Sequence, residues 1–131
     1  MPDLTLHLPF PPSVNHYWRT AVRQGKASPY VSAQGKAYRK AVKRALGKER
    51  MAGRLAEPLR SRLAVTVGLF APTGARYDID NRMKGLLDAL TDAEVWEDDS
   101  QVDRLVIERG EVIEGGGCVV VIRTRAGETT P

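Results

Sequence analysis

The sequence predicts an α+β fold, a mixed α/β layer in which two helices pack on a roughly four-stranded sheet. Several short segments alternate apolar and polar residues, as half-buried strands do, and one later segment repeats its apolar residues at helical spacing. The predicted order is strand, loop, helix, strand, helix, strand, strand. With 131 residues the chain is long enough to bury a substantial core. We therefore expect a single domain over residues 1–131.

The first strand is predicted over residues 4–8, where LTLHL alternates leucine with polar residues. Three prolines, Pro9, Pro11 and Pro12, follow directly and cannot donate hydrogen bonds to a β-ladder. We therefore expect the strand to end there and a long, basic surface loop to run to Pro29.

A helix is predicted to begin after Ser32, which is a favourable N-cap, and to run to about Leu46. Its inward positions are apolar: Tyr38, Ala41, Val42, Ala45 and Leu46. Its opposite face is basic: Lys36, Arg39, Lys40, Lys43 and Arg44. A basic helix face serves solubility as often as DNA binding, so both interpretations stay open.

The second half of the chain supplies the remaining elements. Residues 63–69 alternate as a strand that ends near Pro72. A second helix is predicted with Asp80 as its N-cap and with an apolar stripe at i, i+3, i+4 and i+7: Met83, Leu86, Leu87 and Leu90. An acidic loop over 93–101, two strands over 102–112 and 118–124, and a frayed tail over 126–131 complete the expectation.

Composition excludes several functional classes. No apolar run approaches the roughly 18 residues of a membrane span, and the N-terminus lacks the features of a signal peptide. Cys118 is the single cysteine, so neither an internal disulfide nor a cysteine-based zinc site is available. With His7 and His16 as the only imidazoles, a zinc enzyme is disfavoured. We expect a cytoplasmic protein with no membrane partner.

Charge is distributed unevenly along the chain. Residues 19–54 carry eleven Lys or Arg and one acid, Glu49. Residues 76–114 carry five basic residues and twelve acids. The basic block suits a polyanion such as DNA, because phosphate contacts dominate nucleic-acid affinity. The acidic block is compatible with a bound polyanion only if cations lie between its carboxylates and the phosphates.

The stretch RYDIDNRMKGLLDAL, residues 76–90, concentrates the candidate chemistry. Asp78 and Asp80 are separated by one residue, so on an extended strand end both would point to the same side. Such carboxylates repel unless a cation lies between them, and Mg²⁺ prefers hard oxygen ligands of this kind. A third carboxylate from Asp98 or Asp99 could complete the pocket. Lys84, one turn past Asp80, could neutralise a carboxylate or stabilise charge on phosphate oxygens.

Each of these features also has a plainer interpretation. Asp80 alone is more often a helix cap than a metal ligand. Lys84 and Asp88 form a solvated i, i+4 pair in most helices that carry them. What favours a metal site is the conjunction of the whole pattern, D-x-D-N-x-x-K-x-x-x-D-x-L followed by Asp98-Asp99, within a basic chain.

The chain closely resembles the RusA-type Holliday junction resolvases. The segments that carry the resemblance are PFPPSVNHYW, VSAQGKAYRKAV and YDIDNRMKGLLDALTDAEVWEDDSQV, in this order and over nearly the whole chain. These proteins are crossover junction endodeoxyribonucleases, often found on prophages. The resemblance implies a RusA-like fold and a homodimer that resolves four-way DNA junctions by paired, symmetric, Mg²⁺-dependent nicks, with Mn²⁺ able to substitute.

By match of the motif, the resemblance implies catalytic, metal-binding roles for Asp78, Asp80 and Asp99 and a catalytic role for Lys84. Asp98 and Asn81 lie in the same motif. Some relatives carry a run of basic residues before the first aspartate, whereas here only Arg76 precedes Tyr77. The candidate DNA contacts are Arg76, Lys36, Arg39, Lys40, Lys43, Tyr17 and Trp18.

Tyr17 and Trp18 could stack on exposed bases at the branch point, or they could be buried against the sheet. Two other functions stay open beside the resolvase. A branched-DNA-binding protein that does not cut would rest on the basic segment alone. A phosphohydrolase acting on small substrates would use the carboxylates and leave the basic segment without a role.

Overall fold

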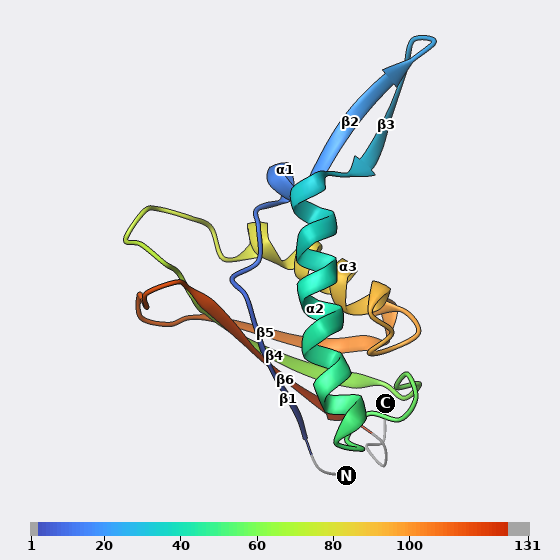
Figure 1. The fold of residues 1–131 in the computed structure, drawn as a ribbon, viewed down its shortest axis with the longest axis vertical. Coiled ribbons are helices and arrows are strands. Elements are labelled where there is room, and N and C mark those ends of the chain that lie inside the picture. The colour runs from blue at the N-terminus through green and yellow to red at the C-terminus, as the bar shows by residue number, and fades with distance from the viewer. Residues whose placement is uncertain (1–2, 126–131) are drawn as a thin grey trace.

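The computed structural model describes residues 3–125 and has the predicted α+β architecture, with helices covering one face of a four-stranded sheet (Figure 1). The strand order is β1-β6-β4-β5, in which β4 and β5 run parallel and the other neighbours run antiparallel. The strands of this sheet are β1 (Leu4–Leu8), β4 (Leu63–Phe70), β5 (Val102–Arg109) and β6 (Gly117–Thr124).

The core lies between this sheet and two helices, α2 (Ala33–Met51) and α3 (Met83–Asp92). The inward residues of β4 alternate with half-exposed ones as the sequence predicts, and Leu63 and Val67 are completely buried. The apolar stripe of the second helix is also confirmed, since Met83, Leu86 and Leu90 are buried and Leu87 is half-buried against the core. Within the described residues, no helix is both long enough and apolar enough to cross a membrane.

The expected long loop between Pro9 and Pro29 is wrong. The chain forms the short helix α1 (Val14–Tyr17) and then a hairpin of β2 (Trp18–Arg23) and β3 (Lys26–Val31) that projects from the body (Figure 1). Gln24 and Gly25, both with positive φ, form the two-residue turn. Positive φ at both central residues is typical of a type I′ turn, whose twist matches that of the flanking strands.

The predicted ends of several elements shift in the structure. Ser32 caps α2 as predicted, with its Oγ accepting a hydrogen bond of 3.0 Å from the Gly35 N–H. The helix continues beyond Leu46 to Met51 and ends near Gly53, whose positive φ suits a helix terminus. The strand predicted over 102–112 ends at Arg109. The tail over 126–131 lies outside the described residues.

Gly35 allows α1 to approach α2 closely. A Cβ at this position would lie 2.6 Å from the Tyr17 carbonyl oxygen, which also accepts a hydrogen bond of 2.9 Å from the Ser32 N–H and so cannot move away freely. We expect Gly35→Ala to destabilise the protein by roughly 1–3 kcal/mol, as measured by urea unfolding. Gly47→Ala is the control, because a Cβ there contacts nothing within 4 Å. It should stabilise the same helix by about 0.5–1 kcal/mol, and a shift of both variants in the same direction would contradict this account.

Candidate active site

The parallel pairing of β4 and β5 sets the position of the site. Leu69 pairs with Arg109, and the Gly110 N–H donates a hydrogen bond of 2.7 Å to the Leu69 carbonyl. The carboxyl ends of the two strands therefore meet at one edge of the sheet, the edge where open α/β sheets commonly bind ligands. The loop that leaves β4 at this edge, residues 71–79, carries Asp78.

The local geometry of the aspartate pair differs from the prediction. β4 ends at Phe70, so Asp78 lies in irregular chain rather than at a strand end. Ile79 has helical backbone angles, φ −65 and ψ −36, so the argument from an extended chain does not apply to the two side chains. Asp80 opens a 3₁₀ turn over Asp80–Arg82, and no side chain caps this turn or α3. The predicted role of Asp80 as an N-cap is therefore wrong.

The loop is anchored by a stack of aromatic rings and guanidinium groups. The rings of Phe10 and Tyr77 meet edge to face with centroids 5.3 Å apart. The Arg82 guanidinium lies 4.9 Å from the Phe10 centroid and 5.5 Å from that of Tyr77, and it donates a hydrogen bond of 2.9 Å to the Pro11 carbonyl. Burial lowers the pKa of Arg82. The N-terminal proline-rich segment thus fixes both ends of the Asp78–Asp80 turn.

The carboxylates of Asp78, Asp80 and Asp99 share an unusual property. All three are exposed, and none makes a hydrogen bond or ion pair with the part of the chain that the structure describes. The side chains of the other described aspartates all have partners: Asp3 with Arg123, Asp88 and Asp92 with Arg39, Asp98 with Ser100, and Asp103 with Arg62. The three aspartates that the motif singles out are therefore the described aspartates whose carboxylates have no partner.

Asp99 does not join Asp78 and Asp80 within one chain. It opens a 3₁₀ turn, Asp99–Gln101, directly before β5, and the first residue of β5, Val102, pairs with Leu63 at the start of β4. Asp99 thus lies at the amino end of the parallel pair, whereas Asp78 follows the carboxyl end. Among the described residues, no three side chains of His, Cys, Asp or Glu are grouped so that they could hold a metal ion.

Asp98 has a structural role in this loop. Its carboxylate accepts a hydrogen bond of 3.1 Å from the Ser100 N–H, and this hydrogen bonding lowers the pKa of Asp98. Gln101 completes the capping box through its Oε1, and its Nε2 donates a hydrogen bond of 2.9 Å to the Leu59 carbonyl. The turn is therefore fixed against the body, and Asp99 is held on its exposed side.

Lys84 lies on α3 one turn after Asp80, and its side chain is exposed. Its ammonium group is 6.0 Å from the centroid of the Trp18 ring, at the base of the hairpin. Trp18 is half-buried, and its Nε1 is buried without a hydrogen-bond partner in the described structure. Lys84 therefore faces the junction between the body and the hairpin.

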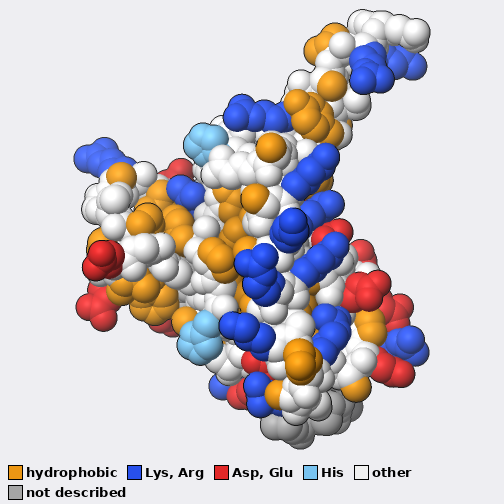
Figure 2. Space-filling view, viewed as in Figure 1, with side chains coloured by type: hydrophobic (Ala, Val, Ile, Leu, Met, Phe, Trp, Pro, Cys, Tyr) orange, Lys and Arg blue, Asp and Glu red, His pale blue; other side chains and the backbone are white. Residues whose placement is uncertain are grey.

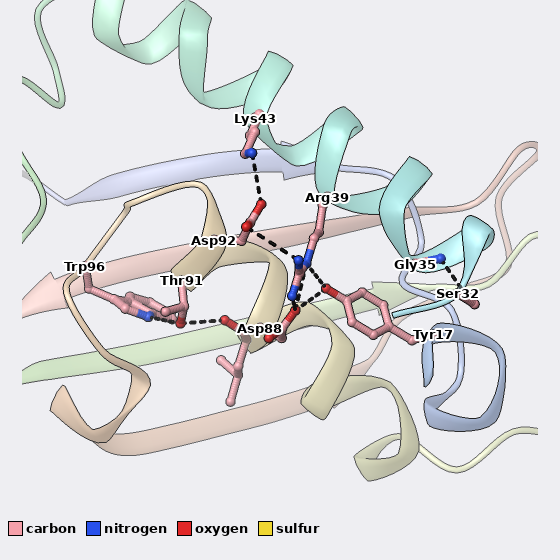
Figure 3. A network of polar contacts seen from close by, with 10 residues as sticks. Tyr17, Ser32, Gly35, Arg39, Lys43, Asp88, Thr91, Asp92 and Trp96 are labelled. Carbon is pink, nitrogen blue, oxygen red and sulfur yellow. Dashed lines mark hydrogen bonds and ion pairs between the residues drawn. The ribbon is translucent and has the colours of Figure 1, made fainter. Parts of the chain in front are cut away.

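A partly buried polar network connects α1, α2 and α3 (Figure 3). The Tyr17 hydroxyl donates to Asp88, and Arg39 donates to the Tyr17 oxygen over 2.9 Å and to Asp88 over 2.7 Å. Arg39 and Lys43 also pair with Asp92, over 3.6 and 3.1 Å. Burial, together with the hydrogen bond to Asp88, raises the pKa of Tyr17 well above its ordinary value.

This network corrects two expectations. Tyr17 is completely buried, so it cannot stack on DNA bases in this conformation, and its ring packs against the helix α3 at Gly85 rather than against the sheet. Asp88 pairs with Arg39 across two helices rather than with Lys84 along one.

On the basic face of α2, the charges of Arg39 and Lys43 are partly neutralised by Asp88 and Asp92. Lys36 and Lys40 stay exposed on α2 without a described ion pair.

Basic side chains are concentrated along α2 on one face of the molecule (Figure 2). Lys and Arg side chains form a stripe along α2 that continues toward the hairpin, and Asp and Glu side chains lie along its right-hand margin (Figure 2). Arg19, Arg23 and Lys26 belong to the hairpin, and residues 18–31 contain no acid. The basic stripe therefore borders acidic side chains, and Arg39 and Lys43 form ion pairs with Asp88 and Asp92 of the acidic segment.

Comparison with known proteins relates this chain to a family of nucleases. Residues 9–123 match the family described as Endodeoxyribonuclease RusA. The chain is 40% identical over 109 residues to the crossover junction endodeoxyribonuclease of Enterobacteria phage HK97, covering 83% of this chain and 84% of that protein. It is 34% identical over 128 residues to the protein of the same name from Escherichia coli K12, covering 98% and 100% of the two chains.

Proposed function

Because the chain belongs to the RusA family of endodeoxyribonucleases, we propose that it resolves Holliday junctions by paired, symmetric nicks that depend on Mg²⁺. The observation that carries this proposal is that the motif aspartates, Asp78, Asp80 and Asp99, are the described aspartates without a protein partner. A stability role would pair these carboxylates with donors or cations, as it does the others. A role in holding a cation leaves them exposed and free.

The donor set fits magnesium. Mg²⁺ is held by one or two carboxylates together with water and phosphate oxygens, and Asp78 and Asp80, one residue apart in the sequence, supply two exposed carboxylates. When bound, the ion would polarise the phosphodiester and lower the pKa of a water molecule. Asp78 and Asp80 orient the phosphate beside them, and Lys84 offers an ammonium group to charge that develops on its oxygens. Mn²⁺ has similar ligand preferences and is expected to substitute.

The position of Asp99 supports a site shared between two chains. Within one chain Asp99 lies at the opposite end of the parallel strand pair from Asp78 and Asp80. In a two-fold dimer in which Asp99 of one copy lies beside Asp78 of the other, the reciprocal contact would form a second, identical site. A four-way junction has approximate two-fold symmetry, so such a homodimer presents one site to each of two opposing strands.

Cleavage assays on junction, flap and duplex DNA, with Mg²⁺ and with EDTA, test the function. We expect paired nicks in the junction with Mg²⁺ and none with EDTA. Junction binding without nicks under both conditions would instead support a branched-DNA-binding protein that does not cut. Turnover of small phosphate esters that junction DNA does not inhibit would support a small-substrate phosphohydrolase.

The hairpin is proposed as an arm that contacts the DNA duplex next to the branch point. Its basic side chains, Arg19, Arg23 and Lys26, have no acidic neighbour within β2 and β3. We expect replacement of all three by Gln to weaken junction binding roughly tenfold to a hundredfold at physiological salt, because three phosphate contacts would be lost. Fluorescence anisotropy with a labelled junction in EDTA measures this loss.

The matched control for the hairpin is Val22→Ser, which removes an exposed apolar side chain of β2 and leaves the charge unchanged. It should bind the junction with unchanged affinity. Equal affinity of the triple variant and the wild type would exclude the hairpin as a DNA contact.

A further inference from the structure

An open depression of about 480 Å³ lies at the carboxyl edge of the β4–β5 pair, directly beside Asp78. The sequence pattern gives no indication of it, because one of its residues comes from the end of β5. It is lined by Gly74, Ala75, Arg76, Tyr77, Asp78 and Arg109. Its charged groups are therefore two guanidinium groups and one carboxylate.

The Arg109 guanidinium is held by the loop that carries Asp78. Its Cζ lies 4.2 Å from the centroid of the Tyr77 ring, and its Nη2 donates a hydrogen bond of 3.0 Å to the Tyr77 carbonyl. Arginine has five N–H donors in a planar fork, so this single bond leaves most of them free. Tyr77 is itself fixed by Phe10 and Arg82. Arg109 is thus oriented before any ligand binds.

The backbone beside Arg109 is also fixed. A Cβ at Gly110 would lie 2.4 Å from the Phe70 ring, so the chain passes closely over this ring at the end of β4. The Gly110 N–H donates to the Leu69 carbonyl over 2.7 Å. Arg109 therefore projects from the rigid end of the sheet, not from a loose loop.

The depression carries excess positive charge. Neither Arg76 nor Arg109 makes an ion pair with any described acid, although both are exposed. Other exposed arginines of the protein do pair, such as Arg62 with Asp103 and Arg123 with Asp3. Unpaired guanidinium groups are well suited to bind a phosphodiester, since they donate charge-assisted hydrogen bonds in a geometry that matches its oxygens.

We propose that Arg76 and Arg109 form a binding site for a backbone phosphate of the DNA strand that passes Asp78. This inference rests on the proposed function, because it takes DNA as the ligand. Arg109 and Arg76 bind the phosphate next to the scissile phosphate, which lies at Asp78 and Asp80. The DNA strand is thereby positioned over the two aspartates. Both residues position the substrate and make no contact with the reacting atoms.

The test is the salt dependence of junction binding in EDTA, where no cleavage interferes. Log affinity falls with log salt, and the loss of one phosphate contact makes this negative slope less steep by about 0.9. We expect Arg109→Ala and Arg76→Ala each to make the slope less steep by about 0.9, and the double variant by about twice that. Arg104→Ala is the matched control, since Arg104 is an exposed arginine earlier on β5 that does not line this depression. Its slope should equal that of the wild type.

A lysine variant separates phosphate binding from a structural effect. Arg109→Lys keeps the charge, so its slope should remain that of the wild type. Its affinity should fall severalfold, because an ammonium group cannot stack flat on Tyr77 and donate a planar fork to the phosphate. Urea unfolding of each variant checks that the fold is kept.

The outcomes distinguish this inference from the proposed function. If the wild type cuts junctions and Arg109→Ala keeps the wild-type slope, the phosphate site is wrong and the nuclease function stands. If Arg109→Ala dissociates the dimer without changing the slope, Arg109 serves the contact between copies, and the phosphate site is again wrong. If the wild type neither binds nor cuts junction DNA, the proposed function fails and the phosphate site fails with it.

Discussion

Replacement of Asp80 by Asn is expected to reduce cleavage of a synthetic four-way junction by roughly a thousandfold or more, since a bound metal ion contributes several kcal/mol to such a reaction. Asp80 is exposed and has no described partner, so its loss should leave the fold unchanged. Junction binding should be equal to that of the wild type or tighter, because removal of a negative charge reduces the repulsion of the DNA phosphates. Cleavage under single-turnover conditions and binding in EDTA measure the two effects separately.

The control for this variant is Glu57→Gln, which removes another exposed carboxylate without a described partner, away from the motif. It should cleave at the wild-type rate. Full activity of Asp80→Asn would exclude the metal site, and loss of binding together with cleavage would indicate that Asp80 supports the fold or the dimer instead.

A mixture of two inactive variants is expected to recover activity. In a dimer of one Asp80→Asn chain and one Asp99→Asn chain, a shared site would combine the intact Asp78–Asp80 turn of one chain with the intact Asp99 of the other. The second site would carry both substitutions. In an equal, fully exchanged mixture about half of the dimers would be mixed, and each mixed dimer would have one active site of its two. The mixture should therefore contain about a quarter of the active sites of the same amount of wild type. Co-expression of differently tagged chains and purification of the mixed dimer allow a direct measurement.

The products of the mixed dimer give a second readout. With one active site, it should nick one strand of the junction and leave the opposing strand intact, so nicked junctions should accumulate in place of resolved duplexes. If Asp99 instead acted within its own chain, both sites of the mixed dimer would carry one substitution and cleavage would stay at the level of the single variants. That result would exclude the shared site. Each homodimeric variant alone is the control.

Local patterns were sufficient to predict most of the fold. The alternation in residues 63–69 and the stripe Met83, Leu86, Leu87 and Leu90 follow from a strand period of two and a helix period of 3.6, and the structure confirms both elements. The Ser32 cap is confirmed for the same reason, because its partner Gly35 is three residues away. The hairpin was missed because its strands are mostly exposed and carry little apolar alternation. Gln24-Gly25 is a weaker turn signal than Asn-Gly.

The sequence by itself determined the candidate chemistry of this protein: the carboxylates of Asp78, Asp80 and Asp99, the lysine one turn after Asp80, and the excess of positive charge toward the N-terminus. Their residue types and spacing are local properties, and they persist whatever the rest of the chain does. Only the tertiary structure decided which of these side chains lie close together and which other residues join them. Parallel pairing of β4 with β5 brings Arg109 to Asp78 and sends Asp99 to the opposite end of the sheet. Contacts between residues so far apart in the chain depend on strand order and direction, which periodicity alone does not encode.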